Sequence, residues 1–348
     1  MNIPAKPWNR HQLPRRILAI RLQAMGDVAI TLPYLRGLRE SLPPSTQLDL
    51  LTREETEGIP GTIHLFDNVY ALGGGRDHKK IILHTLLMLP RLLLRRYDVI
   101  LDLQNNIYSD IVRKTLRPKA WALYDKYSPV SAAERYRLTI EAVGLGPNQA
   151  CYSLRLKDAA LGLDLLYNKG WNGEDDLVAL NPAGAFITRN WDINNYAAFA
   201  RLWLLQRPRT QFMVLGTSFI AAKAAELRQQ LGAHLLDLTG QTTTEEAFSI
   251  LQHVKLMLSE DSGLMHMAWI SGVPTLALFG STRSDWSRPI GDHTLLLSSS
   301  DLPCGDCMQA TCRFGDVHCL TRHTPELVLD HALALMNFSA CAGTEGNG

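Results

Sequence analysis

The sequence lacks the features of membrane-spanning, secreted and fibrous proteins. Its longest apolar tract, residues 81–94, is interrupted by a histidine, a proline and an arginine, so it has no apolar stretch of the about 20 residues that a spanning helix requires. The charged N-terminus is followed only by the short run Ile17 to Ile20, which is no signal-peptide core. It contains no internal repeat and no low-complexity tract. These absences predict a globular, cytoplasmic protein.

A strong net charge is missing as well. The formal charge of the whole chain is +1, and we expect no nucleic acid partner. Residues 1–140 nevertheless hold 21 Lys and Arg against 13 Asp and Glu, a net of +8, so the remainder must be −7. A basic first half suits an anionic partner such as a phosphorylated lipid or a membrane surface, and a solvated basic surface is the alternative.

Cysteine is scarce, with six residues in 348, but four of them are grouped in one short segment. Their positions are Cys304, Cys307, Cys312 and Cys319. A reducing cytoplasm favours thiols or a metal over disulfides. The run resembles a four-cysteine zinc or iron site, although the gap between the pairs is shorter than in common zinc ribbons. Free thiols and a structural metal site therefore both stay open.

What the chain does have is a repeated alternation of short apolar runs and helical patterns. This alternation is typical of an α/β protein with mostly parallel sheets covered on both faces. An apolar content of 46% over 348 residues is sufficient for two domains. The alternation lapses at about residues 157–176, where Gly, Asn and acidic residues accumulate. We therefore predict domains at 1–160 and 177–348, joined by a linker at about 157–176.

The segment Leu256 to Phe279 combines an apolar run, an acidic turn, a short helical pattern and a second apolar run. A loop that leaves a parallel strand and opens a helix presents free N–H groups and the positive end of the helix dipole, where phosphates bind. Asp261 and Ser262 are suited to cap the helix, and Gly263 allows close approach of a ligand. The alternative is an ordinary capped helix.

Ligands of doubly wound sheets bind beyond the carboxyl ends of the strands. Loops that follow five predicted strands should therefore converge on one cleft. These strands end at Ile20, Leu180, Leu215, Leu238 and Leu258.

Three segments together resemble the ADP-heptose:lipopolysaccharide heptosyltransferases. They are the loop Arg21 to Pro33, the run AsnProAlaGly with ThrArgAsnTrp at residues 181–191, and GluAspSerGlyLeuMetHis through PheGlySerThr at residues 260–282. The resemblance implies a GT-B fold of two Rossmann-like domains facing a central cleft. It also implies an acceptor-binding N-terminal domain, a nucleotide-sugar-binding C-terminal domain, and inverting transfer without a strict need for metal.

By this resemblance, Asp27 corresponds to the proposed catalytic base and Arg189 to a basic residue that meets the donor diphosphate. The implied donor-binding residues are Thr188, Asp261, Ser262, Gly263, Leu264 and His266. Two positions depart from the family pattern. ThrSerPheIle follows Gly216 where relatives tend to carry an acid for the ribose, and Thr244 stands where they tend to be apolar near the adenine.

The chemistry of these residues suits the roles, with an alternative for each. An acceptor hydroxyl must lose a proton as it attacks, and Asp27 could accept it, or it could merely be the N-cap of a helix that begins at Val28. Arg189 could neutralise the departing diphosphate or be a surface arginine. His266 could donate to a phosphate or simply pack.

The preferred interpretation is a glycosyltransferase, peripheral to the inner membrane, that moves heptose from ADP-heptose to a lipopolysaccharide inner-core acceptor. No cofactor is expected for catalysis. One alternative is a GT-B transferase or a nucleotide-sugar epimerase with another donor or acceptor. Another is a nucleotide-sugar-binding module without catalysis, against which the presence of both Asp27 and Arg189 argues.

Overall fold

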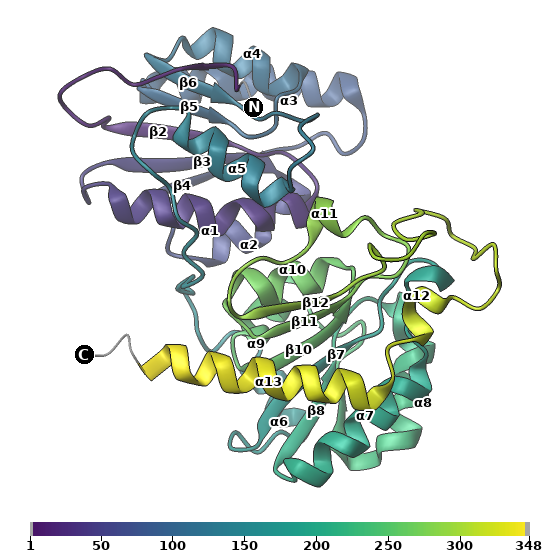
Figure 1. Ribbon diagram of the computed structural model, residues 1–348. Helices are drawn as coiled ribbons and strands as arrows, with labels where there is room; N and C mark the ends of the chain where they lie inside the picture. The colour runs from purple at the N-terminus through teal and green to yellow at the C-terminus, as the bar shows by residue number, and fades with distance from the viewer. Residues whose placement is uncertain (1–2, 345–348) are drawn as a thin grey trace. The chain divides into compact units, whose positions relative to one another are not determined.

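The computed structural model describes the backbone of residues 3–344 and the side chains of residues 3–337. The chain forms two compact units, Met1–Lys157 and Asp158–Gly348. Each unit is an α/β domain built on one six-stranded sheet (Figure 1).

The sheet of unit 1 has the strand order β1-β6-β5-β2-β3-β4, and only β1 runs antiparallel to its neighbour. The order reverses between β2 and β5, which is the switch point of a doubly wound sheet. The strands are β1 (Ala5–Lys6), β2 (Arg16–Ile20), β3 (Gln47–Arg53), β4 (Asn68–Leu72), β5 (Val99–Asp102) and β6 (Ala120–Leu123).

Helices cover both sides of this sheet. On one side, α3 and α4 pack together over a core that includes Leu18, Ile20 and Ile100, while α1 contacts α5 on the other. The helices of unit 1 are α1 (Met25–Ser41), η1 (Glu54–Thr56), α2 (Gly58–Thr62), α3 (His78–Arg95), α4 (Ile107–Leu116) and α5 (Ala132–Glu141).

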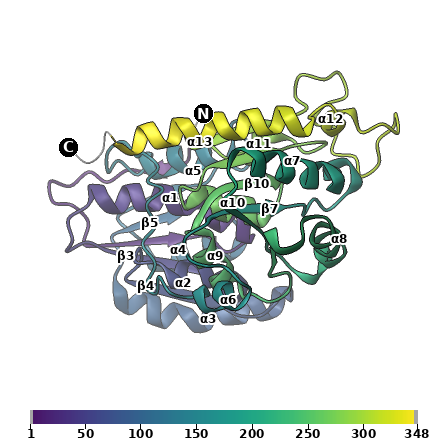
Figure 2. The ribbon, with the colours of Figure 1, turned by 90° about the horizontal axis from the view of Figure 1, so that it is seen from below.

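The sheet of unit 2 is fully parallel, with the order β12-β11-β10-β7-β8-β9 and its switch point between β7 and β10. Figure 2 shows its helices from a second direction. The strands are β7 (Asp176–Asn181), β8 (Thr210–Val214), β9 (Leu235–Asp237), β10 (Val254–Glu260), β11 (Thr275–Leu278) and β12 (Thr294–Leu297). The helices are α6 (Leu163–Asn168), η2 (Ile187–Arg189), α7 (Ile193–Gln206), η3 (Ser218–Ile220), α8 (Ala221–Leu231), η4 (Gly232–His234), α9 (Thr244–Leu251), α10 (Gly263–Ile270), α11 (Ser284–Ser287), α12 (His318–Thr321) and α13 (Pro325–Thr344).

Successive residues of the unit 2 strands point to opposite faces of the sheet. Leu276 and Leu278 of β11 join the large core under α7, α8 and α13, whereas Ala277 and the adjacent Phe279 pack with Met265 of α10 on the other face. Both faces of the sheet are thus buried, which explains why its strands are continuous apolar runs.

The division between the units falls at Lys157, at the N-terminal edge of the linker predicted at about 157–176. The rest of that segment packs with unit 2. Leu166 of α6 is fully buried, and Trp171 stacks on Tyr167 and lies against His253. The composition of the segment predicted a linker, but its few apolar side chains pack against the C-terminal unit.

Candidate functional site

The clearest candidate site lies at the switch point of unit 2, where β7 and β10 end side by side. Ser262 is the N-cap of α10, and its hydroxyl accepts a hydrogen bond from the N–H of Met265 at 3.3 Å. The amide of Asn181, at the end of β7, donates to Ser259 Oγ at 2.8 Å and to Ser262 Oγ at 2.5 Å. These bonds hold the start of α10 in place, with its free N–H groups at the strand ends.

A cavity of about 630 Å³ opens at this helix start, a size that suits a small organic ligand. Four of the predicted donor-binding residues line it. They are Asp261, Ser262, Gly263 and Leu264. Segments 216–220 and 242–244 also contribute, so the loops after β7, β8, β9 and β10 converge within unit 2. That the loop after Ile20 joins the same cleft stays a prediction.

Arg189 lies next to this cavity. Its Nη1 is 3.5 Å from Asp261 Oδ2, its guanidinium stacks over the ring of Phe186 at 5.2 Å, and both charged side chains are largely buried. The buried Nε of Arg189 has no hydrogen-bond partner in the described structure. A guanidinium beside a helix N-terminus is suited to bind a diphosphate.

Glu260, directly before Asp261, fixes the segment that carries Arg189. Its fully buried carboxylate accepts the N–H of Gly184 at 2.5 Å and the N–H of Trp191 at 2.6 Å. Burial raises the pKa of Glu260 to about 7, while the nearby Lys223 acts in the opposite direction. The ammonium of Lys223 donates to the carbonyl of Pro182 at 2.7 Å and to Asn190 Oδ1. Glu260 and Lys223 therefore brace both ends of the 182–191 loop.

Glu260→Gln should flatten the pH dependence of stability between about pH 4.5 and pH 7. Because folding raises the pKa of Glu260, the native state holds its proton more tightly, and the free energy of unfolding falls as pH rises through this window. The fall in the parent is on the order of 3 kcal/mol, and the variant should lose it. Urea unfolding at pH 5 and pH 8 measures the difference. Glu246→Gln serves as the control, because it changes a half-buried carboxylate of α9 that also accepts a backbone N–H, that of Thr243 at 2.8 Å. An unchanged pH slope in Glu260→Gln would contradict the assignment.

In unit 1, Asp27 is paired with a buried arginine. Arg21 Nη2 lies 2.6 Å from Asp27 Oδ2, and the Asp27 side chain is 39% exposed. Arg21 Nη1 donates to the carbonyl of Leu103 at 2.7 Å, and the guanidinium lies over the rings of Tyr124 and Tyr136. Arg21 thus orients a carboxylate that is still accessible at the carboxyl end of β2.

The alternative that Asp27 is the N-cap of a helix beginning at Val28 is wrong. The helix begins at Met25 after the N-cap Ala24, and Asp27 is its third residue. The Asp27 carboxylate bonds back to the N–H of Ala24 at 3.1 Å. Asp27 therefore stabilises the start of α1, and its carboxylate is at the same time accessible to solvent.

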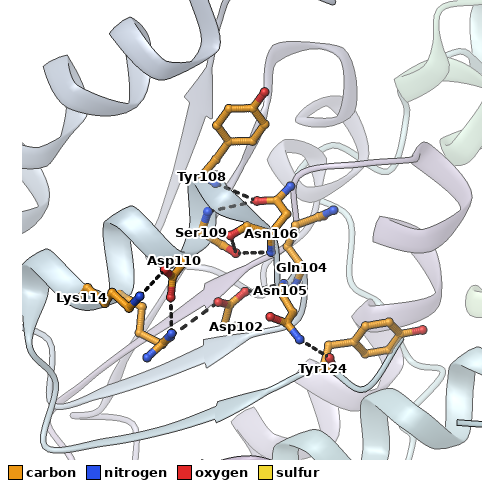
Figure 3. A network of polar contacts seen from close by, with 10 residues as sticks. Asp102, Gln104, Asn105, Asn106, Tyr108, Ser109, Asp110, Lys114 and Tyr124 are labelled. Carbon is orange, nitrogen blue, oxygen red and sulfur yellow. Dashed lines mark hydrogen bonds and ion pairs between the residues drawn. The ribbon is translucent and has the colours of Figure 1, made fainter. Parts of the chain in front are cut away.

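The loop after β5 supports the loop that bears Asp27. Gln104 Oε1 accepts the N–H groups of Leu22 and Gln23 at 2.9 and 3.2 Å. Asp102 accepts the N–H of Asn105, whose amide donates to the carbonyl of Tyr124 at 2.8 Å (Figure 3). Hydrogen bonds thus join the ends of β2, β5 and β6, around the switch point of unit 1.

Two predicted donor-binding residues lie outside the unit 2 cavity. The buried hydroxyl of Thr188 bonds to Ser281 Oγ at 2.9 Å and to the carbonyl of Gln309 at 2.5 Å. His266 is buried in α10, 6.2 Å from the ring centre of Trp269. Thr188 anchors the cysteine segment, and His266 packs inside the domain, so their donor roles remain predictions.

The four grouped cysteines line a second cavity in unit 2, of about 520 Å³, together with Thr188 and Ser281. Among the described residues, no three His, Cys, Asp or Glu side chains are arranged to hold a metal ion. The predicted four-cysteine site is therefore not assembled in this structure. Cys312 Sγ lies 3.8 Å from Asp316 Oδ1, and N–H groups of Phe314 and Val317 lower the pKa of the Cys312 thiol.

Sequence reasoning missed the roles of Arg21, Glu260 and Lys223. Arg21 and Glu260 lie inside the segments that resemble the heptosyltransferases. A charged residue at the end of a buried strand is the sequence signal that could have identified both. Lys223 lies on α8, and nothing in the sequence connects it to the 182–191 loop.

The family model for glycosyltransferase family 9 (heptosyltransferase) matches residues 87–318. Lipooligosaccharide heptosyltransferase 2 of Campylobacter jejuni is 24% identical, over 71% of this chain and 77% of that protein. Lipopolysaccharide heptosyltransferase 1 of Pseudomonas aeruginosa is 24% identical, over 92% and 98%. The structure of the ADP-heptose lipopolysaccharide heptosyltransferase II of E. coli superposes with a TM-score of 0.71 at 18% identity, covering 92% of this chain and 98% of that one. The expected GT-B fold class is confirmed.

Proposed function

Because this chain belongs to glycosyltransferase family 9, we propose that it transfers a heptose from ADP-heptose to an inner-core acceptor of lipopolysaccharide, with inversion at the anomeric carbon. The observation that carries the proposal is the cavity at the start of α10, with a guanidinium beside a helix N-terminus. That pairing suits a nucleoside diphosphate leaving group.

We assign the donor to unit 2. The diphosphate would accept hydrogen bonds from the first N–H groups of α10 and from Arg189, and the nucleoside would lie in the cavity along residues 216–220 and 242–244. Glu260 is a positioning residue because it holds the backbone on both sides of Arg189. The cavity offers hydroxyls from Thr217, Ser218 and Thr244 in place of a charged side chain for the ribose.

We assign the proton transfer to Asp27 of unit 1. In a single displacement, the acceptor oxygen bonds to the anomeric carbon as the bond to the ADP oxygen breaks, which inverts that carbon. The hydroxyl proton passes to the Asp27 carboxylate. Arg21 keeps this carboxylate turned toward the end of β2. Arg189 stabilises the charge that develops on the departing ADP.

The acceptor also implies where the enzyme works. Among the described residues, no helix is long and apolar enough to cross a membrane. Lipopolysaccharide precursors are lipid-linked, so we propose that the protein acts in the cytoplasm as a peripheral protein at the inner membrane surface.

The cysteine segment provides a separate, structural proposal. Cys304, Cys307, Cys312 and Cys319 share one cavity, and the first three raise the pKa of Cys319 beyond the effect of burial. We propose that zinc or iron draws these thiols together and orders the loop, with no catalytic step at the metal.

Elemental analysis tests the metal. Purified protein should contain zinc or iron that Cys304→Ser/Cys307→Ser loses and Cys151→Ser retains, because Cys151 lies in the other unit. Four titratable thiols in the loop, with neither metal present, would remove the site.

Mass spectrometry of the core oligosaccharide from a deletion strain tests the function. We expect a core that lacks this heptose and any sugar attached through it, and that the parent gene restores. An intact core with altered nucleotide-sugar pools would favour the epimerase alternative.

A further inference from the structure

The outward face of α3 exposes an unusual amount of apolar surface. Leu83, Leu87 and Leu94 are 54%, 68% and 82% exposed, and Leu86 and Leu93 are about half exposed. Leu83, Leu87, Pro90 and Leu94 follow the spacing i, i+4, i+7, i+11, so they lie in one stripe along the helix. Single exposed leucines are common, but a stripe of this length marks an interaction surface.

The opposite side of α3 makes the contacts of this helix with the core of unit 1. Ile81, Thr85, Leu89 and Leu92 are buried, and α3 packs on β4 and beside α4 (Figure 1). The exposed leucines therefore contribute nothing to the described core of unit 1. Burying these leucines against a partner would remove apolar surface from water, which is favourable.

Cations flank the stripe at both ends. Between residues 76 and 96 the chain has six Lys and Arg, namely Arg76, Lys79, Lys80, Arg91, Arg95 and Arg96, and a single acid, Asp77. Arg95 donates to the Tyr70 hydroxyl at 2.9 Å and lies 3.9 Å from Asp49, so the other five cations are the ones available to headgroups. The Asp77 carboxylate caps α3 by accepting the N–H groups of Lys79 and Lys80 at 2.9 and 3.3 Å. Leucines that can enter an acyl layer, flanked by cations, form the pattern of a helix that lies in the surface of an anionic bilayer.

We propose that the exposed face of α3 docks unit 1 onto an anionic lipid surface, with its leucine stripe in the acyl boundary and its Lys and Arg side chains at the headgroups. The inference rests on the proposed function, since a lipid-linked acceptor is met at such a surface. A second copy of the chain fits less well, because pairing two such faces would bring like charges together.

Flotation of the full-length protein with lipid vesicles tests the proposal. The parent should bind vesicles of phosphatidylcholine mixed with phosphatidylglycerol more strongly than phosphatidylcholine alone, and salt should weaken the binding. Leu87→Ser/Leu94→Ser should reduce binding to the mixed vesicles by at least about tenfold. Leu205→Ser, at a leucine of unit 2 that is also 82% exposed, should bind like the parent.

Three results would overturn the proposal: no binding of the parent to the mixed vesicles, equal binding by Leu87→Ser/Leu94→Ser, or an equal loss in Leu205→Ser. A parent dimer that Leu87→Ser/Leu94→Ser dissociates in sedimentation would assign the face to a second copy instead. Transfer to a delipidated core oligosaccharide should be unchanged in Leu87→Ser/Leu94→Ser. A parent inactive with every acceptor would refute the proposed function without changing the vesicle result.

Discussion

Replacing Asp27 with Asn is expected to lower heptose transfer by roughly 10²–10⁴-fold while ADP still binds. Asn keeps the size of the side chain and an oxygen that can accept the N–H of Ala24, but it cannot accept a proton at neutral pH. Steady-state kinetics with the acceptor measure the loss of transfer, and isothermal titration with ADP measures donor binding separately.

Asp27→Asn should also lower the stability of the protein, and this effect must be separated from the loss of catalysis. Asp27→Asn removes the counter-charge of the buried Arg21, which should lower the free energy of unfolding by about 1–2 kcal/mol, since Asp27 itself is partly exposed. Glu134→Gln is the matched control. Glu134 is also in the first turn of a unit 1 helix, is 37% exposed, and lies 2.5 Å from Arg137. If Asp27→Asn turns over like the parent, Asp27 is only a structural residue of α1.

Arg189→Ala should weaken ADP binding roughly 10- to 150-fold, which corresponds to about 1.5–3 kcal/mol for a charged hydrogen bond. The substitution also leaves the Asp261 carboxylate without its arginine beside the diphosphate, so the effect should lie toward the upper end. Isothermal titration with ADP measures the change.

Arg283→Ala is the control for Arg189→Ala. Arg283 is likewise an arginine of unit 2 that pairs with an acid, Asp285 at 2.5 Å, and stacks over an aromatic ring, that of Trp286. It does not line the α10 cavity. Equal ADP affinity in the parent and in Arg189→Ala would remove Arg189 from the donor site.

The sequence predicted the two α/β domains because buried parallel strands are continuous apolar runs separated by helical patterns. It also predicted the turn at Asp261 to Leu264, whose residues are adjacent in the chain. It could not predict the hydrogen bonds that the Glu260 carboxylate accepts from the N–H groups of Gly184 and Trp191, which lie about 70 positions away in the chain. The half-buried β12 and the long α13 were not identified either.

Helix α3 shows a different limit. Its sequence, an apolar tract flanked by Lys and Arg, fits both an amphipathic helix that covers a sheet and a helix at a lipid surface. The helix does cover the sheet, but leucines occur all round it, so periodicity alone could not show which of them stay exposed. Only the packing of α3 on β4 and α4 shows which of its faces is buried and which is exposed.

Incubation of the purified protein with ADP-heptose and heptose-deficient lipopolysaccharide tests the central claim most directly. We predict that mass spectrometry finds the acceptor heavier by one heptosyl residue, with ADP released in equal amount and the new linkage of opposite anomeric configuration to the donor. Hydrolysis or epimerisation of the sugar nucleotide without transfer, or consumption of a different nucleotide sugar in place of ADP-heptose, would contradict it.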